Sequence, residues 1–206
     1  MRVPVRILLA SSNPGKLAEY RALAQTAAPS SQVDVELIPG FDSLPSFEEN
    51  ASTFAENSVG KALHYSRLSE GLVFADDSGL EVPALGGRPG VHSARYAGPK
   101  ATSAERIEKL LCELRGKKGS QRVAHFVCAL ALAKQGHAIA VVTDRVEGEI
   151  LNSPSGSGGF GYDPVFYYPP LKKTFAELTA EEKNLHSHRG KAFRKLLATL
   201  DVAQAR

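Results

Sequence analysis

The sequence predicts an α/β fold with a mixed central sheet flanked by helices. Residues 3–10 are apolar and β-branched with little alternation, as in a strand buried on both faces, and residues 72–75 form a second apolar run. Residues 122–133 and 137–150 resemble two long strands joined by Lys134-Gln135-Gly136, where a glycine suits a hairpin turn. The hairpin requires antiparallel pairing, so the predicted sheet is mixed rather than purely parallel.

Helices are predicted between these strands. A helical pattern follows Lys16, and a final helix is expected over residues 191–200, after Ser187-His188-Arg189-Gly190 interrupts the pattern. Capping boxes, in which Thr precedes Glu by three residues, predict three more helix starts at Thr53, Thr102 and Thr179. The first of these helices should cover residues 54–69. Short strands are expected at residues 33–38 and 165–168.

Length and composition predict a single domain, built of one or two closely joined lobes, over residues 1–206. The mass is 22.0 kDa and the formal charge is +3, which suits an anionic small ligand but is too weak and too dispersed to indicate nucleic acid. No apolar run approaches the roughly 20 residues of a membrane span, and no signal peptide is expected. Cys112 and Cys128 lie among apolar neighbours, so we expect two buried, reduced thiols and a cytoplasmic protein.

The stretch Phe74-Ala75-Asp76-Asp77-Ser78-Gly79 is the centre of the functional prediction. We expect a buried strand to deliver both acids to its carboxyl end, where ligands commonly bind in open α/β sheets. Adjacent carboxylates repel, and Mg²⁺ is a hard cation that could hold both ionised. The alternative is a structural turn in which Asp and Ser cap the local backbone.

A second candidate is the loop Ser11-Ser12-Asn13-Pro14-Gly15-Lys16, between a predicted strand and a predicted helix. Such a loop presents backbone N–H groups and a helix dipole to an anion, so it is a candidate phosphate site, although it lacks the Walker A spacing. An ordinary turn capped by Ser or Asn is the alternative.

Other charged residues are candidates with structural alternatives. Glu48 and Glu49 precede a predicted helix N-terminus and could approach the central acids, and Lys61 could face phosphates. The alternative, which the sequence alone favours for Lys61, is a solvated position on the surface. Arg95 could bind phosphate with two donors or could instead tie down its loop. In the glycine-rich loop, Phe160 could stack on a planar base or be a core aromatic in a linker.

Six motifs in order resemble the inosine/xanthosine triphosphate pyrophosphatase family over nearly the whole chain. Ser12 stands where many members have Gly, and its small size should preserve the loop. The motifs are Ser12-Asn13-x-x-Lys16-x-x-Glu19, Phe54-x-x-Asn57-x-x-x-Lys61-Ala62, Ala75-Asp76-Asp77-Ser78-Gly79-Leu80, Gly90-Val91-x-Ser93-Ala94-Arg95-Tyr96, Gly159-Phe160-Gly161-Tyr162-Asp163-Pro164 and Ser187-His188-Arg189-Gly190.

The resemblance implies an elongated fold of two lobes with an active-site cleft between them, a homodimer, and Mg²⁺-dependent hydrolysis of a nucleoside triphosphate to the monophosphate and pyrophosphate. It implies that Asp77 is the general base and a metal ligand, that Glu48 is a second metal ligand, and that Glu49, Lys61, Asp76 and Arg95 assist. The implied nucleotide contacts are Ser11, Ser12, Asn13, Pro14, Gly15, Lys16, Ser78, Phe160, Gly161, Tyr162, Asp163, Lys183, His188 and Arg189.

The implied substrates are inosine, deoxyinosine and xanthosine triphosphates, whose bases carry an oxygen at purine position 6. Donors such as His188 or Arg189 would pair with that oxygen and would oppose the amine of adenine. Three alternatives stay open: a nucleotide hydrolase of different base preference, a catalytically silent nucleotide-binding protein, and a nucleic-acid-binding module. The retained acids Glu48, Asp76 and Asp77 disfavour the silent protein, and the dispersed charge disfavours the module.

Overall fold

The structure is a computed structural model that describes residues 5–27 and 33–204. It contains a seven-stranded sheet in the order β2-β1-β3-β4-β5-β6-β7. The strands are β1 (Val5–Leu9), β2 (Val33–Leu37), β3 (Leu72–Glu81), β4 (Val123–Lys134), β5 (His137–Ile150), β6 (Phe166–Tyr168) and β7 (Lys173–Thr174). β1 pairs in parallel with β2 and β3, whereas β6 pairs antiparallel with β5 and β7. The predicted mixed sheet is therefore confirmed.

The chain divides into two compact units. The first contains the described parts of Met1–Asp77, Cys128–Asp144 and Arg189–Arg206, and the second contains Ser78–Val127 and Arg145–His188. β3, β4 and β5 each contribute residues to both units.

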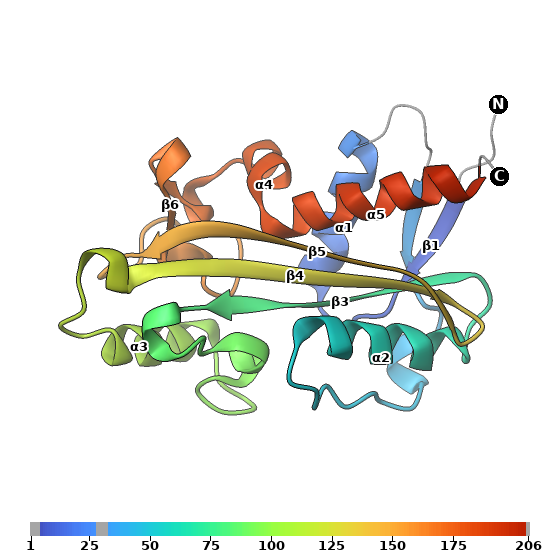
Figure 1. Cartoon of the computed structure of the whole chain (residues 1–206), viewed down its shortest axis with the longest axis horizontal. Helices are drawn as coiled ribbons and strands as arrows, with labels where there is room; N and C mark the ends of the chain where they lie inside the picture. Colours follow the sequence, from blue (N-terminus) through green and yellow to red (C-terminus); the bar gives the residue numbers. More distant parts are fainter. Residues whose placement is uncertain (1–4, 28–32, 205–206) are drawn as a thin grey trace. The chain divides into compact units, whose positions relative to one another are not determined.

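Helices cover both faces of the sheet in the first unit. α1 (Pro14–Ala27) and α5 (His188–Gln204) lie on one face, and α2 (Phe54–Ser66) lies on the other (Figure 1). Successive strand residues alternate between two apolar clusters, as the pleat requires. Ile7, Leu9 and Phe74 pack with α1 and α5, whereas Val73 and Ala75 pack with α2. This alternation decides which way the central acids point.

The second unit has its own core. α3 (Ser103–Glu113) contributes Ile107 and Leu110, which pack with a cluster of aromatic rings that includes Phe126, Phe166 and Phe175. The short helix α4 (Ala180–His186) ends immediately before Ser187. The functional loops of this unit are anchored to that core.

Several predicted details are confirmed. The Thr53, Thr102 and Thr179 capping boxes are present, and a fourth, from Thr174 to Glu177, was missed because it opens only one 3₁₀ turn. The hairpin turn consists of Gln135 and Gly136, both with positive φ, which matches the strand twist.

Three predictions are wrong. α5 begins at His188 rather than Lys191, because the interruption is confined to Ser187. Cys112 is exposed, because it lies outside the buried stripe of α3, whereas Cys128 is buried as expected and both are free thiols. β3 also continues to Glu81, so Asp76 and Asp77 lie within the strand and not at its end.

Candidate active site

Asp76 and Asp77 point to opposite faces of β3. The parallel neighbour β1 ends at Leu9, which is in register with Phe74, so both acids lie just beyond the carboxyl end of β1. Asp76 follows Phe74 in the pleat and contacts α1 and α5, whereas Asp77 follows Ala75 and contacts α2. The two carboxylates therefore do not lie side by side and do not need one shared cation. The prediction that Mg²⁺ holds both of them ionised is wrong in this respect.

Asp76 is fully buried and its charge is balanced by protein groups. Its carboxylate accepts hydrogen bonds from Lys16 Nζ at 3.1 Å, Tyr20 Oη at 2.7 Å and Arg189 Nε at 2.9 Å. Arg189 also binds Glu19 at 2.5 Å. Burial alone would lower the pKa of Arg189, but Glu19 and Asp76 raise it above its ordinary value. Asp76 is thus paired with two cationic side chains, Lys16 and Arg189, and it fixes Lys16 beside the site.

Asp77 lies near another carboxylate, that of Glu49. It is 7% exposed, and its Oδ2 accepts a hydrogen bond from Asn57 Nδ2 at 2.9 Å. Burial, followed by the negative charge of Glu49, raises the pKa of Asp77 from 3.8 to about 6. A carboxylate with a pKa close to neutrality is suited to accept a proton from water and to release it again.

The loop before α2 brings a second carboxylate toward Asp77. Glu49 Oε1 accepts a hydrogen bond from Lys61 Nζ at 2.6 Å, and its charge acts on Asp77. Glu48 is exposed, and its carboxylate accepts a hydrogen bond from Asn50 Nδ2 at 2.8 Å. Of the two loop acids, Glu49 is the one for which an interaction with Asp77 is evident.

The predicted phosphate loop forms the N-terminus of α1. Asn13 Oδ1 caps the helix by accepting hydrogen bonds from the N–H groups of Gly15 at 2.9 Å and Lys16 at 3.3 Å, and Pro14 occupies the first helical position. Ser11 is buried and accepts a hydrogen bond from Asn13 N, whereas Ser12 is exposed. The structure therefore shows the cap, and a capped helix N-terminus can still bind an anion, so phosphate binding by this loop stays a prediction.

In the second unit, Asp163 organises the loop that carries Phe160. Its buried Oδ2 accepts hydrogen bonds from Phe160 N at 2.8 Å and from Lys183 Nζ at 2.7 Å. Lys183 Nζ also lies 4.9 Å from the centre of the Phe160 ring. A Cβ on Gly159 would lie 2.1 Å from Asp163 Oδ2 and φ there is +69°, so glycine is required. An aromatic face and an ammonium donor are thus held together.

Tyr162 anchors the same loop to its own unit. It is buried, and its hydroxyl donates to the carbonyl of Ser93 at 3.0 Å. Ser93 Oγ in turn accepts from Leu80 N at 2.9 Å, so these bonds connect the Phe160 loop to β3.

The remaining predicted residues lie in varied environments. His188 is buried and stacks on Phe126 with ring centres 4.7 Å apart, whereas Arg95, Ser78 and Gly161 are half-buried.

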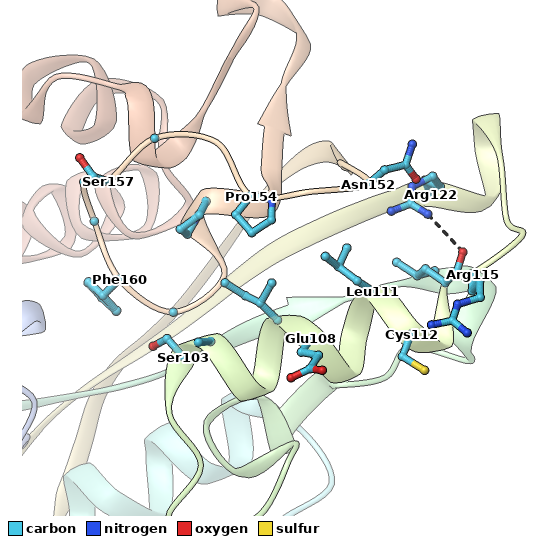
Figure 2. Close-up of a pocket in the computed structure, with 18 of the residues that line it drawn as sticks. Ser103, Glu108, Leu111, Cys112, Arg115, Arg122, Asn152, Pro154, Ser157 and Phe160 are labelled. Atoms are coloured by element: carbon cyan, nitrogen blue, oxygen red, sulfur yellow. Dashed lines mark hydrogen bonds between the residues drawn. The ribbon is translucent and has the colours of Figure 1, made fainter.

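A groove of about 960 Å³ lies between α3 and the glycine loop of the second unit (Figure 2). Only Phe160 and Gly161 among the predicted site residues line it. The groove is bordered mainly by apolar side chains of α3 and by loop backbone, with Cys112 near one end. It does not mark the place where the predicted residues converge.

The donor set around Asp77 fits a divalent cation that takes few protein ligands. Two carboxylates, Asp77 and Glu49, are close enough to raise the pKa of Asp77, and a divalent cation would relieve that repulsion. Among the side chains that the structure describes, no group of three or more His, Cys, Asp or Glu residues is preassembled around a metal position. Mg²⁺ tolerates this because it commonly keeps several waters and takes substrate phosphates as ligands.

Comparison with known proteins supplies the family. A model described as the Ham1 family matches residues 7–199. The chain belongs to the Ham1 family. The "dITP/XTP pyrophosphatase" of Geobacillus kaustophilus is 52% identical over 190 residues, which are 92% of this chain and 91% of that protein. A protein of the same name from Thermus thermophilus is 48% identical and covers 94% of this chain and 90% of that protein.

Comparison with solved structures also finds similarity to Ham1 proteins. The structure of a HAM1 protein from Coxiella burnetii has a TM-score of 0.84 at 42% identity and covers 96% of this chain and 98% of that one. The Ham1 protein of Staphylococcus aureus has a TM-score of 0.83 at 38% identity and covers 96% and 99%. The α/β fold of this Ham1 chain is therefore shared with solved members of its family.

Sequence reasoning assigned no role to three side chains of the Ham1 chain, although Glu19 and Asn57 stand in the motifs. Tyr20 and Glu19 complete the surroundings of Asp76 and Arg189, and Asn57 holds Asp77. Tyr20 looked like a core aromatic in a helical stripe, and only its buried hydroxyl distinguishes it. Asn57 had a stronger signal, because a polar residue on the buried face of an amphipathic helix requires a partner.

Proposed function

We propose that this chain hydrolyses non-standard purine nucleoside triphosphates, namely ITP, dITP and XTP, to the nucleoside monophosphate and pyrophosphate. One observation carries the proposal: a buried carboxylate with a pKa near 6, Asp77, lies in the first unit with Glu49, in a chain of the Ham1 family. The activity named for its relatives supports the substrate class.

In the proposed reaction, Asp77 accepts the proton of the water that attacks the α-phosphate. The hydrogen bond from Asn57 orients the carboxylate, and burial keeps it basic enough for this role. The bond between the α-phosphate and the bridging oxygen breaks, and pyrophosphate leaves. Lys16 and Lys61 stabilise the charge that develops on the leaving phosphates, and the N-terminus of α1, with Ser11 to Gly15, binds phosphate oxygens.

Mg²⁺ is the proposed cofactor. Asp77 and Glu48 are its proposed ligands from the resemblance, and Glu49 is a further candidate because its charge acts on Asp77. When bound, Mg²⁺ would neutralise phosphate charge and make the attacking water more acidic. Asp76 contributes indirectly by fixing Lys16.

In the second unit, we propose that Phe160 stacks on the purine and that Lys183 donates to the oxygen at position 6. Asp163 supports this by holding both groups. His188 and Arg189 remain proposed donors, although Nε and one terminal nitrogen of Arg189 bind carboxylates. Ser78, Arg95, Gly161 and Tyr162 are proposed to shape the nucleotide site.

Pyrophosphate release from ITP and XTP, measured beside ATP and GTP in the presence of Mg²⁺, tests the proposal. We expect a strong preference for ITP and XTP. Equal rates on all four would contradict the base-reading argument and favour a hydrolase of broader preference. Nucleotide binding without turnover of any of them would favour a catalytically silent protein.

Three further properties are also proposed. The resemblance implies a homodimer, which light scattering on the purified protein tests. Residues 1–206 are proposed to act as one domain. The two free thiols suit a reducing compartment, and we propose the cytoplasm. Among the described residues, no helix is long and apolar enough to cross a membrane.

A further inference from the structure

The buried side chain of Asn57 connects two parts of the first unit by hydrogen bonds. It is 1% exposed on α2, and both ends of its side-chain amide are used. Its Nδ2 donates to Asp77 Oδ2 at 2.9 Å, and its Oδ1 accepts from the backbone N–H of Ala51 at 2.9 Å. One amide thus links the acid on β3 to the loop that carries Glu48 and Glu49.

The chemistry of the two partners fixes the orientation of this amide. The Ala51 N–H can only donate, so it requires the carbonyl oxygen of Asn57, and the NH₂ group must then face Asp77. A carboxylate at position 57 would repel Asp77, and an apolar side chain would remove the partners of buried Asp77 Oδ2 and of the part-buried Ala51 N–H. An amide of this length is the side chain that serves both partners.

A second bond from α2 holds the same loop. Lys61, one turn after Asn57, binds Glu49 Oε1 at 2.6 Å. The helix therefore fixes the loop at its backbone through Asn57 and at a carboxylate through Lys61. Since Asn57 also holds Asp77, the spacing between the acids of the loop and of the strand depends on this residue.

We propose that Asn57 is a positioning residue that sets Asp77 and the Glu48–Glu49 loop at the spacing required to bind a divalent cation. This inference deepens the proposed function and rests on it for the role of the cation in turnover. It differs from that function in predicting metal affinity in the absence of nucleotide. Groups that orient metal ligands from behind are typically worth about 10- to 100-fold in metal affinity or activity.

The test uses the full chain and Mg²⁺ alone. Isothermal titration calorimetry should show that Asn57→Ala weakens Mg²⁺ binding by about 10-fold or more. Turnover of ITP should show a similar fall in kcat, with KM changed much less, because Asn57 is buried and both ends of its amide are bonded within the protein. The matched control is Ser58→Ala, since Ser58 is also buried on α2 but donates to Ala55 O and touches neither acid. It should bind Mg²⁺ like the unaltered chain.

A double variant separates positioning from a general loss of structure. If Asn57 acts through Asp77, then Asn57→Ala should add little to the loss of Mg²⁺ affinity caused by Asp77→Asn. Should Asn57→Ala fail to fold, Asn57→Ser, whose hydroxyl can serve one of the two partners, replaces it in the same titration.

Two results would overturn the proposal: a folded Asn57 variant with unaltered Mg²⁺ affinity, or an equal loss in Ser58→Ala. Failure of the proposed function would give a different result from failure of the positioning role. In that case the unaltered chain would not hydrolyse ITP, yet Asn57→Ala would still weaken the binding of Mg²⁺, and the positioning role would stand.

Discussion

Replacing Asp77 by Asn should make the folded protein more stable while removing its activity. The pKa of Asp77 is raised from 3.8 to about 6 by burial and by Glu49, so the folded state disfavours the ionised form. Between pH 3.8 and pH 6 the folded state binds more protons than the unfolded state, and stability falls as the pH rises through this window. Well above pH 6, Asp77 is ionised in both states, and the free-energy cost of its charge in the folded state no longer changes with pH.

The magnitude follows from the two pKa values. A difference of one in pKa corresponds to about 1.4 kcal/mol, so the cost of ionised Asp77 is about 3 kcal/mol at pH 7 and about 1 kcal/mol at pH 4.5. The amide that replaces the carboxylate in Asp77→Asn would carry no charge, and its carbonyl could still accept a hydrogen bond from Asn57. Because this bond is weaker than one to a carboxylate, we expect a net gain of about 1–3 kcal/mol at pH 7.

The assay is urea unfolding at pH 7 and pH 4.5, with EDTA present so that no metal alters the charge. The matched control is Asp42→Asn, because Asp42 is exposed on a surface turn. Turnover of ITP with Mg²⁺ should fall about 10²- to 10⁴-fold in Asp77→Asn, as expected for loss of a general base. A loss of stability at pH 7, or the same gain at both pH values, would refute the reasoning.

Three other predictions concern the supporting residues. Tyr20→Phe removes the hydroxyl that donates to buried Asp76 and should lower the free energy of unfolding in urea by about 1.5–3 kcal/mol; an unchanged value would contradict this role of Tyr20. Gly79→Ala would place a Cβ 2.3 Å from Ser93 Oγ, so thermal unfolding should show a loss of about 1–3 kcal/mol; an unchanged Tm would contradict the packing. Lys183→Met should raise the KM for ITP about tenfold or more, because a charged donor is lost, and an unchanged KM would exclude Lys183 from base binding.

The mixed sheet, most helix starts and the family resemblance could all be predicted from the sequence. These depend on local signals, such as the capping box at Thr53 and the hairpin turn at Gly136, or on motif order. Local patterns suffice because caps and tight turns are formed by residues close together in the chain.

The surroundings of each acid could not be predicted in this way, because they form when distant segments fold together. Asp76 and Asp77 look equivalent in the sequence, yet the pleat directs one toward Arg189, which is 113 residues away, and the other toward Asn57. The carboxylate of Asp76 is therefore balanced by Lys16 and Arg189, and that of Asp77 has a raised pKa. A pKa depends on burial and on charges brought close by folding, and neither can be read from neighbours in the chain.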